Sequence, residues 1–222
     1  MNKVRIWDLP TRLFHWSLAL CVLGLVITGN VGGDAMAWHF RLGYTVFTLL
    51  LFRLAWGFVG GHWSRWSNLP LAPHQVLAWW RNAPAASTQA GHNPLGSVSV
   101  LAMLGFLALQ VATGLVSDDE IANTGPLYAL VTSSTVSLAT SWHKHWGKLI
   151  LIVLVLLHVL AILWYRIRKR ISLVPPMLHG DKNLASAVPS SRDHWAARWL
   201  ALLVLCCAAM AVAWVVGLGN AV

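Results

Sequence analysis

The sequence predicts an all-α integral membrane helical bundle, and three observations support this fold class. Hydrophobic residues make up 57% of the 222-residue chain and the mean hydropathy is +0.62. Charged residues make up only 10%, whereas soluble domains carry about 25%. Five apolar stretches each approach the roughly 20 residues that a helix needs to cross a bilayer. Hydrocarbon offers no partner to backbone polar groups, so such long unbroken stretches form helices.

The five stretches place the elements in order along the chain. We expect membrane helices over residues 12–32, 37–59, 95–116, 142–167 and 197–218. Residues 1–180 then form one membrane domain with four helices, and residues 181–222 form a linker and a fifth membrane helix. The first stretch has no small-residue cleavage site before Asp34, so we interpret it as a retained span and not as a signal peptide.

Two connecting segments are long enough to need an interpretation of their own. Residues 61–94 are too polar to span a membrane and mix tryptophan with arginine. Such a segment is typical of the membrane interface, and we expect part of it to be a short helix. Residues 121–141 are rich in Ser, Thr and Val, and we expect a partly ordered loop there.

The basic residues indicate the orientation of the chain in the membrane. A net charge of +9 and a pI near 10.2 would suggest nucleic-acid binding in a soluble protein. Here the basic residues lie in alternate loops between apolar stretches, so the positive-inside rule explains them and no nucleic-acid partner is expected. With five spans, this pattern predicts a cytoplasmic N-terminus and a periplasmic C-terminus in a bacterial inner membrane. The surrounding partner is then membrane lipid.

The chain has ten histidines, and half of them lie in or at the ends of predicted spans: His15, His39, His143, His145 and His158. Ionisable residues inside membrane spans are costly and usually functional. The other five lie in inner-side loops, where solvated or interfacial side chains are expected. The candidate functional residues are therefore the histidines of the spans.

The direction of each span predicts how deep its histidine lies. His15 is near the inner end of the first span, and His39 is near the outer end of the second. In the fourth span His143 starts near the outer face, and His158 lies about 22 Å deeper by helix rise. Two pairs result, His39 with His143 and His15 with His158. Regular helix phase favours His143 over His145, but an irregular start of this span would leave His145 possible.

Two histidines from different helices at each of two levels match the axial ligands of two stacked haems. Neutral imidazole binds haem iron, and two such ligands leave no open position for oxygen chemistry. One-electron transfer across the bilayer is therefore the expected function. A single membrane histidine could equally serve as a hydrogen-bonding group between helices, but four at two matched depths favour haem.

Three cations near the two levels are candidate partners of the anionic haem propionates. Arg41 and Lys148 are predicted near the outer level, and Arg53 approaches the inner level. An arginine within a span is costly without a partner. The alternative for Arg53 is that its side chain extends to the inner interface.

Several motifs resemble those of a known family. They are VRIWDLPTRLFHW at 4–16, HFRLGYTVFTLLLFRLAWGFVG at 39–60, GHNPLG at 91–96, TGLVSDD at 113–119, GPL at 125–127, WHKHWGKLILIVLVLLHV at 142–159 and PM at 176–177. Over residues 4–180 the chain resembles the bacterial di-haem cytochrome b561 family, which shares its fold with the cytochrome b subunits of nickel–iron hydrogenases.

This resemblance implies four haem-bearing helices, two haem b groups and electron exchange with quinone or with a partner redox protein. Such a partner would be a hydrogenase or a soluble cytochrome. The family's ligand pattern falls on four residues of this sequence: His15, His39, His143 and His158. The fifth span has no histidine, and we expect it to pack outside the haem-binding helices.

Taken together, these features predict a cytochrome b of a respiratory chain, an electron-transfer component of an oxidoreductase and not a stand-alone enzyme. Two rival functions are a non-redox membrane anchor subunit and a histidine-based metal-ion transporter. A di-iron membrane oxygenase is less well supported, because it would need dense histidine clusters on the inner side.

Overall fold

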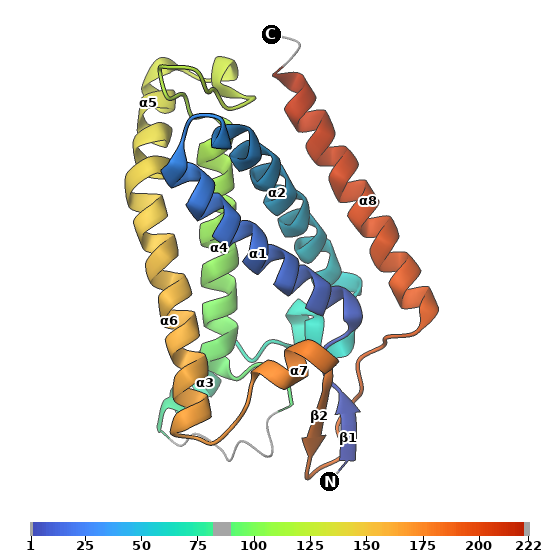
Figure 1. The fold of residues 1–222 in the computed structure, drawn as a ribbon. Coiled ribbons are helices and arrows are strands. Elements are labelled where there is room, and N and C mark those ends of the chain that lie inside the picture. Colours follow the sequence, from blue (N-terminus) through green and yellow to red (C-terminus); the bar gives the residue numbers. More distant parts are fainter. Residues whose placement is uncertain (1, 82–89, 220–222) are drawn as a thin grey trace. The chain divides into compact units, whose positions relative to one another are not determined.

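The computed structural model describes residues 2–81 and 90–219. Within these residues, five helices are long and apolar enough to cross a membrane (Figure 1). They are α1 (Leu9–Val31), α2 (Ala35–Val59), α4 (Pro94–Leu115), the continuous stretch Ser133–Ile167 and α8 (Trp195–Leu218). The predicted fold class, a helical membrane bundle with five spans, is confirmed.

The membrane helices begin at capping groups that hydrophobicity does not reveal. Helix α1 starts earlier than residue 12 because the Asp8 side chain accepts a hydrogen bond from the backbone N–H of Thr11 at 2.8 Å. Helix α4 has Pro94 at its first position, and the Asn93 side chain accepts from the backbone N–H of Gly96 at 2.7 Å. Such caps satisfy the N–H groups that have no partner within a helix.

The fourth membrane helix is longer than predicted. Part of the expected loop is helical, as η4 (Tyr128–Leu130) and α5 (Ser133–Ser141), and α5 continues through the π-helical turn η5 (Trp142–Gly147) into α6 (Lys148–Ile167). The Thr132 hydroxyl caps α5 by accepting from the Thr135 N–H. The prediction failed because Ser and Thr usually favour loops, whereas here a hydroxyl such as that of Thr140 donates to the helix backbone, at 2.8 Å.

The chain divides into two compact units, which are described separately. Unit 1 comprises Met1–His15, Arg53–Ala102 and Val155–Leu203, and unit 2 comprises Trp16–Phe52, Met103–Leu154 and Val204–Val222. Besides parts of the membrane helices, unit 1 contains the short elements η1 (His62–Ser64), η2 (Trp66–Asn68), α3 (Pro73–Arg81) and α7 (Val174–His179). Helix α3 is the short helix expected between the second and third spans.

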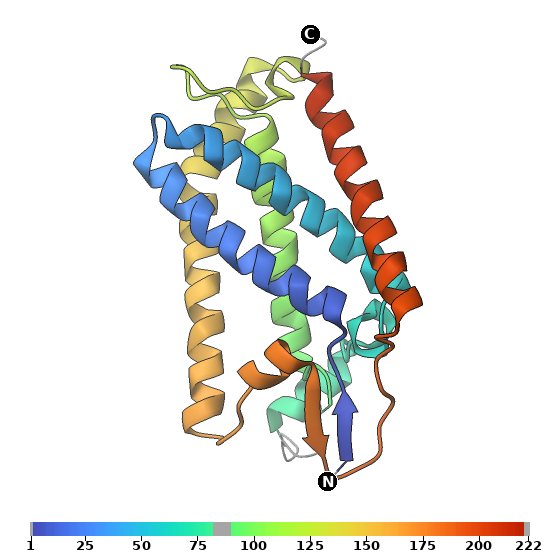
Figure 2. The ribbon, with the colours of Figure 1, turned by 45° about the vertical axis from the view of Figure 1, so that its right-hand side comes forward.

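Unit 1 also contains a two-stranded antiparallel sheet that the sequence did not predict. Strand β1 (Asn2–Arg5) pairs with β2 (Asp181–Leu184), and Figures 1 and 2 both show the two strands side by side. Val4 and Leu184 belong to the buried cluster beneath them. Each strand has only four residues, and their partners are far apart in the sequence, so neither gives a recognisable strand pattern.

Two buried carboxylates connect the elements of unit 1. The fully buried Asp8 accepts hydrogen bonds from the Gly61 N–H at 3.1 Å and from the Ser64 hydroxyl at 2.8 Å. Asp193 forms ion pairs with Arg5 and with Arg198, the latter at 3.2 Å. Burying a carboxylate is costly unless it is paired and hydrogen-bonded. These contacts fix the first turn of α1, the segment after α2 and the segment before α8.

Candidate functional site

In unit 2, His39 of α2 and His143 of η5 face each other. Their ring centroids are 6.1 Å apart, and the ring planes are nearly perpendicular, at 86°. A metal–imidazole nitrogen bond is about 2 Å long, so two imidazoles on opposite sides of one metal ion have ring centres roughly 6 Å apart. The spacing of this pair fits one iron atom between the rings.

The hydrogen bonds of these two histidines orient them as metal ligands. His39 Nδ1 lies 3.1 Å from the Leu25 carbonyl oxygen, and His143 Nδ1 lies 2.8 Å from the Gln110 carbonyl oxygen. A carbonyl can only accept, so each Nδ1 carries the proton and each Nε2 keeps its lone pair. A metal-binding histidine usually donates its other N–H in this way.

A cavity of about 560 Å³ within unit 2 has both histidines in its lining, together with many apolar side chains. Gly29 and Gly114 make room for the rings: a Cβ atom would lie 3.0 Å from His39 Cε1 at the first position and 2.8 Å from His143 Cε1 at the second. Gly43 also lines the cavity, and a Cβ there would meet open space. The cavity therefore suits a large, flat and mostly apolar group such as haem.

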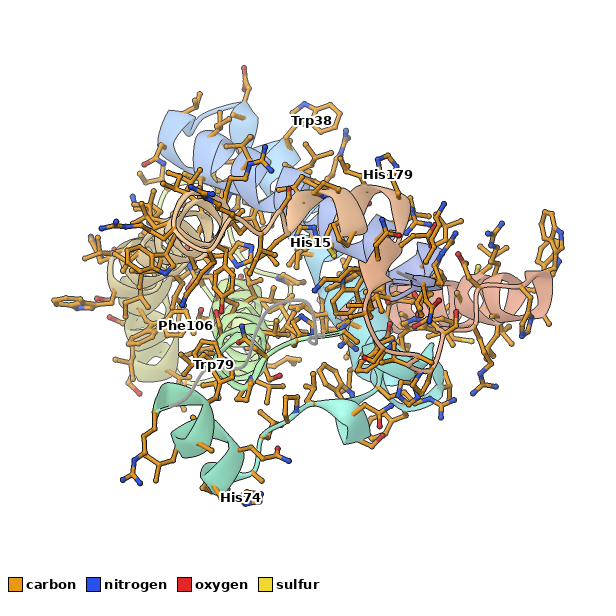
Figure 3. All side chains as sticks on the ribbon, turned by 90° about the horizontal axis from the view of Figure 1, so that it is seen from below. His15, Trp38, His74, Trp79, Phe106 and His179 are labelled. Atoms are coloured by element: carbon orange, nitrogen blue, oxygen red, sulfur yellow. The ribbon has the colours of Figure 1, made fainter. Side chains whose placement is uncertain are left out.

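The structure separates the two cations predicted near this level. Lys148 lines the cavity, and its ammonium group donates to the Asn30 side-chain oxygen at 3.2 Å. Arg41 is exposed instead, with its guanidinium 5.1 Å from the ring of Trp38, a side chain that extends outward from α2 in Figure 3. Lys148 is therefore the predicted propionate partner that the structure brings to the cavity, and Arg41 is not.

The π-helical turn η5 bears on the choice between His143 and His145. Phase along a regular α-helix favoured His143, but η5 is wider than an α-helical turn, so that geometry does not apply here. His143 nevertheless is the residue that faces His39. His145 is exposed, and its Nδ1 bonds to the Ser141 carbonyl oxygen at 3.1 Å.

In unit 1, His15 of α1 and His158 of α6 form a second pair. Their ring centroids are 6.4 Å apart, and the rings are tilted by 51°. This separation also matches the roughly 6 Å expected for two imidazoles on one metal ion. Figure 3 shows His15 surrounded by other side chains, whereas the loop histidines His74 and His179 lie exposed on α3 and α7.

Arg53 is a buried cation in the same unit. Its side chain is only 5% exposed and stacks on Trp66, with 3.9 Å between the guanidinium carbon and the ring centroid. Its Nη1 atom is shielded from solvent and has no hydrogen-bond partner among the described residues. The Arg53 guanidinium is therefore shielded from solvent. A carboxylate such as a haem propionate would accept a hydrogen bond from this Nη1 group and offset the cost of burying it.

His92 is a residue of this region that the sequence interpretation missed. We expected a solvated loop side chain, but its ring lies 4.7 Å from that of Trp7, and its Nδ1 is shielded from solvent without a partner among the described residues. Burial lowers the pKa of His92 to about 4, and the charges of Arg53, His15 and His158 act in the same direction. The feature of the sequence that could have singled out His92 was its position in the motif GHNPLG, just before α4.

The histidines meet in pairs and not in larger clusters. Within residues 2–81 and 90–219, no three His, Cys, Asp or Glu side chains come close enough to hold one metal ion. Two axial imidazoles suffice for a haem iron, because the porphyrin supplies the other ligands. A di-iron centre or a multi-histidine ion site would need a denser set.

Comparisons with known proteins give a family and several relatives of the chain. Residues 6–180 match the family model described as prokaryotic cytochrome b561. Over 215 residues the chain is 28% identical to the probable Ni/Fe-hydrogenase B-type cytochrome subunit of Azotobacter chroococcum mcd 1, covering 81% of this chain and 88% of that protein. It is 29% identical over 134 residues to the probable Ni/Fe-hydrogenase 1 B-type cytochrome subunit of Escherichia coli (strain K12), covering 48% and 55%. No solved structure matches the chain.

Proposed function

Because the chain belongs to the prokaryotic cytochrome b561 family, we propose that it carries electrons across the bacterial inner membrane through two haem b groups. His39 and His143 ligate one iron, and His15 and His158 ligate the other. Membership of this family makes the chain a multi-pass membrane cytochrome that binds haem b and takes part in membrane electron transfer. The number of haems, their ligands and the partners are the substance of the proposal.

The observation that carries this proposal is that the histidines form two pairs. The ring centroids are 6.1 Å apart in the pair of His39 and His143 and 6.4 Å apart in the other pair. Bound haem supplies a reversible one-electron couple. The protein's part would be to ligate each haem with two histidines and to hold each histidine ring still. For His39 and His143, the carbonyl groups of Leu25 and Gln110 hold the rings.

Two cations support the cofactors in this proposal. Arg53 offers a buried guanidinium with an unused N–H group, and Lys148 offers an ammonium group at the cavity that contains His39. Both would pair with carboxylates of the cofactor, which are otherwise costly to place near hydrocarbon. A cation near haem also stabilises the reduced form, because reduction removes one positive charge from the iron.

The proposed partners follow from the relatives. Several are probable B-type cytochrome subunits of Ni/Fe-hydrogenases, so a redox protein of the hydrogenase kind is the partner that we propose first. A soluble cytochrome could take the same role at the periplasmic face. The quinone pool is the proposed second partner, because a lipid-soluble carrier can reach a haem within the membrane.

Haem stoichiometry in single-histidine variants tests the proposal. The wild-type protein, purified in detergent, is expected to show reduced-minus-oxidised b-type bands and two haems per chain. His143→Ala and His158→Ala should each retain one haem. His145→Ala is the matched control, because His145 lies in the same turn as His143 but is exposed, and it should retain two. Absence of b-type bands would refute the function, and loss of a haem only in the His145 variant would refute the pairing.

A further inference from the structure

The two histidines of unit 2 are held by the same arrangement on two different helices. In each case a helix presents a backbone carbonyl, a threonine three residues later and a glycine after that threonine. We call these sets cradles; the first is Leu25, Thr28 and Gly29 on α1, and the second is Gln110, Thr113 and Gly114 on α4. The likeness is confined to these positions, so it does not stand out as a sequence repeat.

The first cradle surrounds His39. Its Nδ1 lies 3.1 Å from the Leu25 carbonyl oxygen and 3.3 Å from the Thr28 hydroxyl. That hydroxyl donates to the Gly24 carbonyl oxygen at 2.7 Å, which leaves its lone pairs to face the ring N–H. Gly29 lies directly against the ring.

The second cradle repeats these contacts around His143. Its Nδ1 lies 2.8 Å from the Gln110 carbonyl oxygen and 3.4 Å from the Thr113 hydroxyl. That hydroxyl donates to the Leu109 carbonyl oxygen at 2.9 Å, and Gly114 lies against the ring. Both rings are therefore oriented by the same three features, a backbone carbonyl, a threonine hydroxyl and a glycine.

The cradles differ at their first residue, which is Leu25 in one and Gln110 in the other. The Leu25 side chain adds no hydrogen bond, whereas Gln110 Nε2 donates to the backbone carbonyl of His143 at 2.8 Å. Gln110 thus contacts His143 twice, accepting from its ring with the main chain and donating to its main chain with the side chain. Gly147 lets the amide approach the π-helical turn, because a Cβ there would collide with Gln110 Oε1.

We propose that Gln110 is a positioning residue for the cofactor ligated by His39 and His143: it holds the π-helical turn η5 so that His143 stays aimed across the cavity at His39. This inference rests on the proposed ligation by His143. The need arises because the second ligand comes from an irregular turn, whereas His39 comes from a regular helix. A wider turn is less constrained by its own backbone and gains rigidity from an outside hydrogen bond.

Gln110→Leu tests the role of the amide alone. Leu25 shows that leucine at this position keeps the carbonyl and the cradle, so the substitution removes the side-chain hydrogen bond and little else. We expect the haem of the His39 pair to be retained about 10-fold more weakly, as is typical for loss of a residue that orients a ligand. Its reduction potential should also rise, because a less firmly held Nδ1–H bond makes His143 a weaker donor to iron. Leu109→Ala, at an exposed site on the same helix, should change neither property.

The measurements are haem stoichiometry, a redox titration resolving two components, and the low-spin electron paramagnetic resonance signal of each haem. The haem of the His15 pair should keep its potential and signal in Gln110→Leu. If the redox components of both haems are unchanged in Gln110→Leu while His143→Ala loses one haem, the role of Gln110 is overturned and the proposed ligation stands. Two haems retained in His143→Ala would instead overturn the ligation.

If Gln110→Leu does not accumulate, the near-isosteric Gln110→Met carries the same expectation. Equal loss of both haems would also overturn the proposal.

Discussion

Single side chains of one chemical type have very different environments in this protein. His143 and His145 are two residues apart, yet one faces His39 with its Nδ1 bonded to a neighbouring helix and the other is exposed. His92, from a loop, is shielded against Trp7. What a histidine can do is therefore decided by the groups around its two nitrogens, because they set its tautomer and its access to a metal.

Replacing Arg53 provides a test at this scale. Arg53→Gln keeps a polar side chain but removes a buried positive charge. We expect the reduction potential of the haem ligated by His15 and His158 to fall, because a nearby cation favours the reduced iron. A redox titration that resolves the two haems measures the change.

Lys148 provides the reciprocal control for this experiment. Lys148→Gln removes a cation from the cavity that contains His39 and should lower only the potential of the haem ligated by His39 and His143. Equal shifts of both haems in either variant would argue against these local pairings.

Among the secondary-structure elements, the regular parts were predictable and the irregular ones were not. Hydrophobicity indicated all five membrane helices to within a few residues, except that the fourth begins at Ser133. The π-helical turn η5 was not predictable, since one of its carbonyl groups bonds to Gln110 on another helix. The strands β1 and β2 are too short to be recognised without knowing that they pair.

The turn after α4 gives a test of pH dependence at the scale of an element. Asp119 accepts hydrogen bonds from the Asn123 side chain and from the backbone N–H groups of Asn123, Ala122 and Ile121, and these lower its pKa. A carboxylate with a lowered folded-state pKa stabilises the turn above its unfolded pKa of about 4. That stabilisation is lost as the pH falls below this value towards the folded pKa.

Hydrogen exchange of the amides of Ile121, Ala122 and Asn123, corrected for the intrinsic rate, measures this effect. Protection should be constant from neutral pH to about pH 5 and decrease on further acidification. Asp119→Asn should weaken protection at neutral pH and remove its dependence on pH. Protection that falls already between pH 7 and pH 5 would show that another group controls the turn.

The arrangement of charge over the whole chain predicts how it crosses the membrane. The loops before α1, between α2 and α4, and after α6 carry basic residues, while the turn after α4 carries Asp118, Asp119 and Glu120. Basic loops favour the cytoplasmic side. With five spans, this pattern predicts an N-terminus in the cytoplasm and a C-terminus in the periplasm.

Reporter fusions test this orientation. Alkaline phosphatase fused to the C-terminus should be active, because it matures in the periplasm, and a fluorescent protein that folds only in the cytoplasm should stay dark there. A matched pair of fusions after residue 180, which lacks α8, should give the opposite result. The same reporter outcome with and without α8 would contradict the predicted topology.

The sequence by itself determined the membrane helices, the family resemblance and the four histidines, because hydrophobicity, span length and motif spacing are local properties of the chain. The ligation of haem by those histidines stays a prediction from both sequence and geometry. Only the tertiary structure decided that His143 and not His145 faces His39, that Lys148 and not Arg41 reaches the cavity, and that His92 is shielded. These outcomes depend on contacts between residues far apart in the chain, such as Gln110 with His143. Such contacts cannot be predicted from a local sequence pattern.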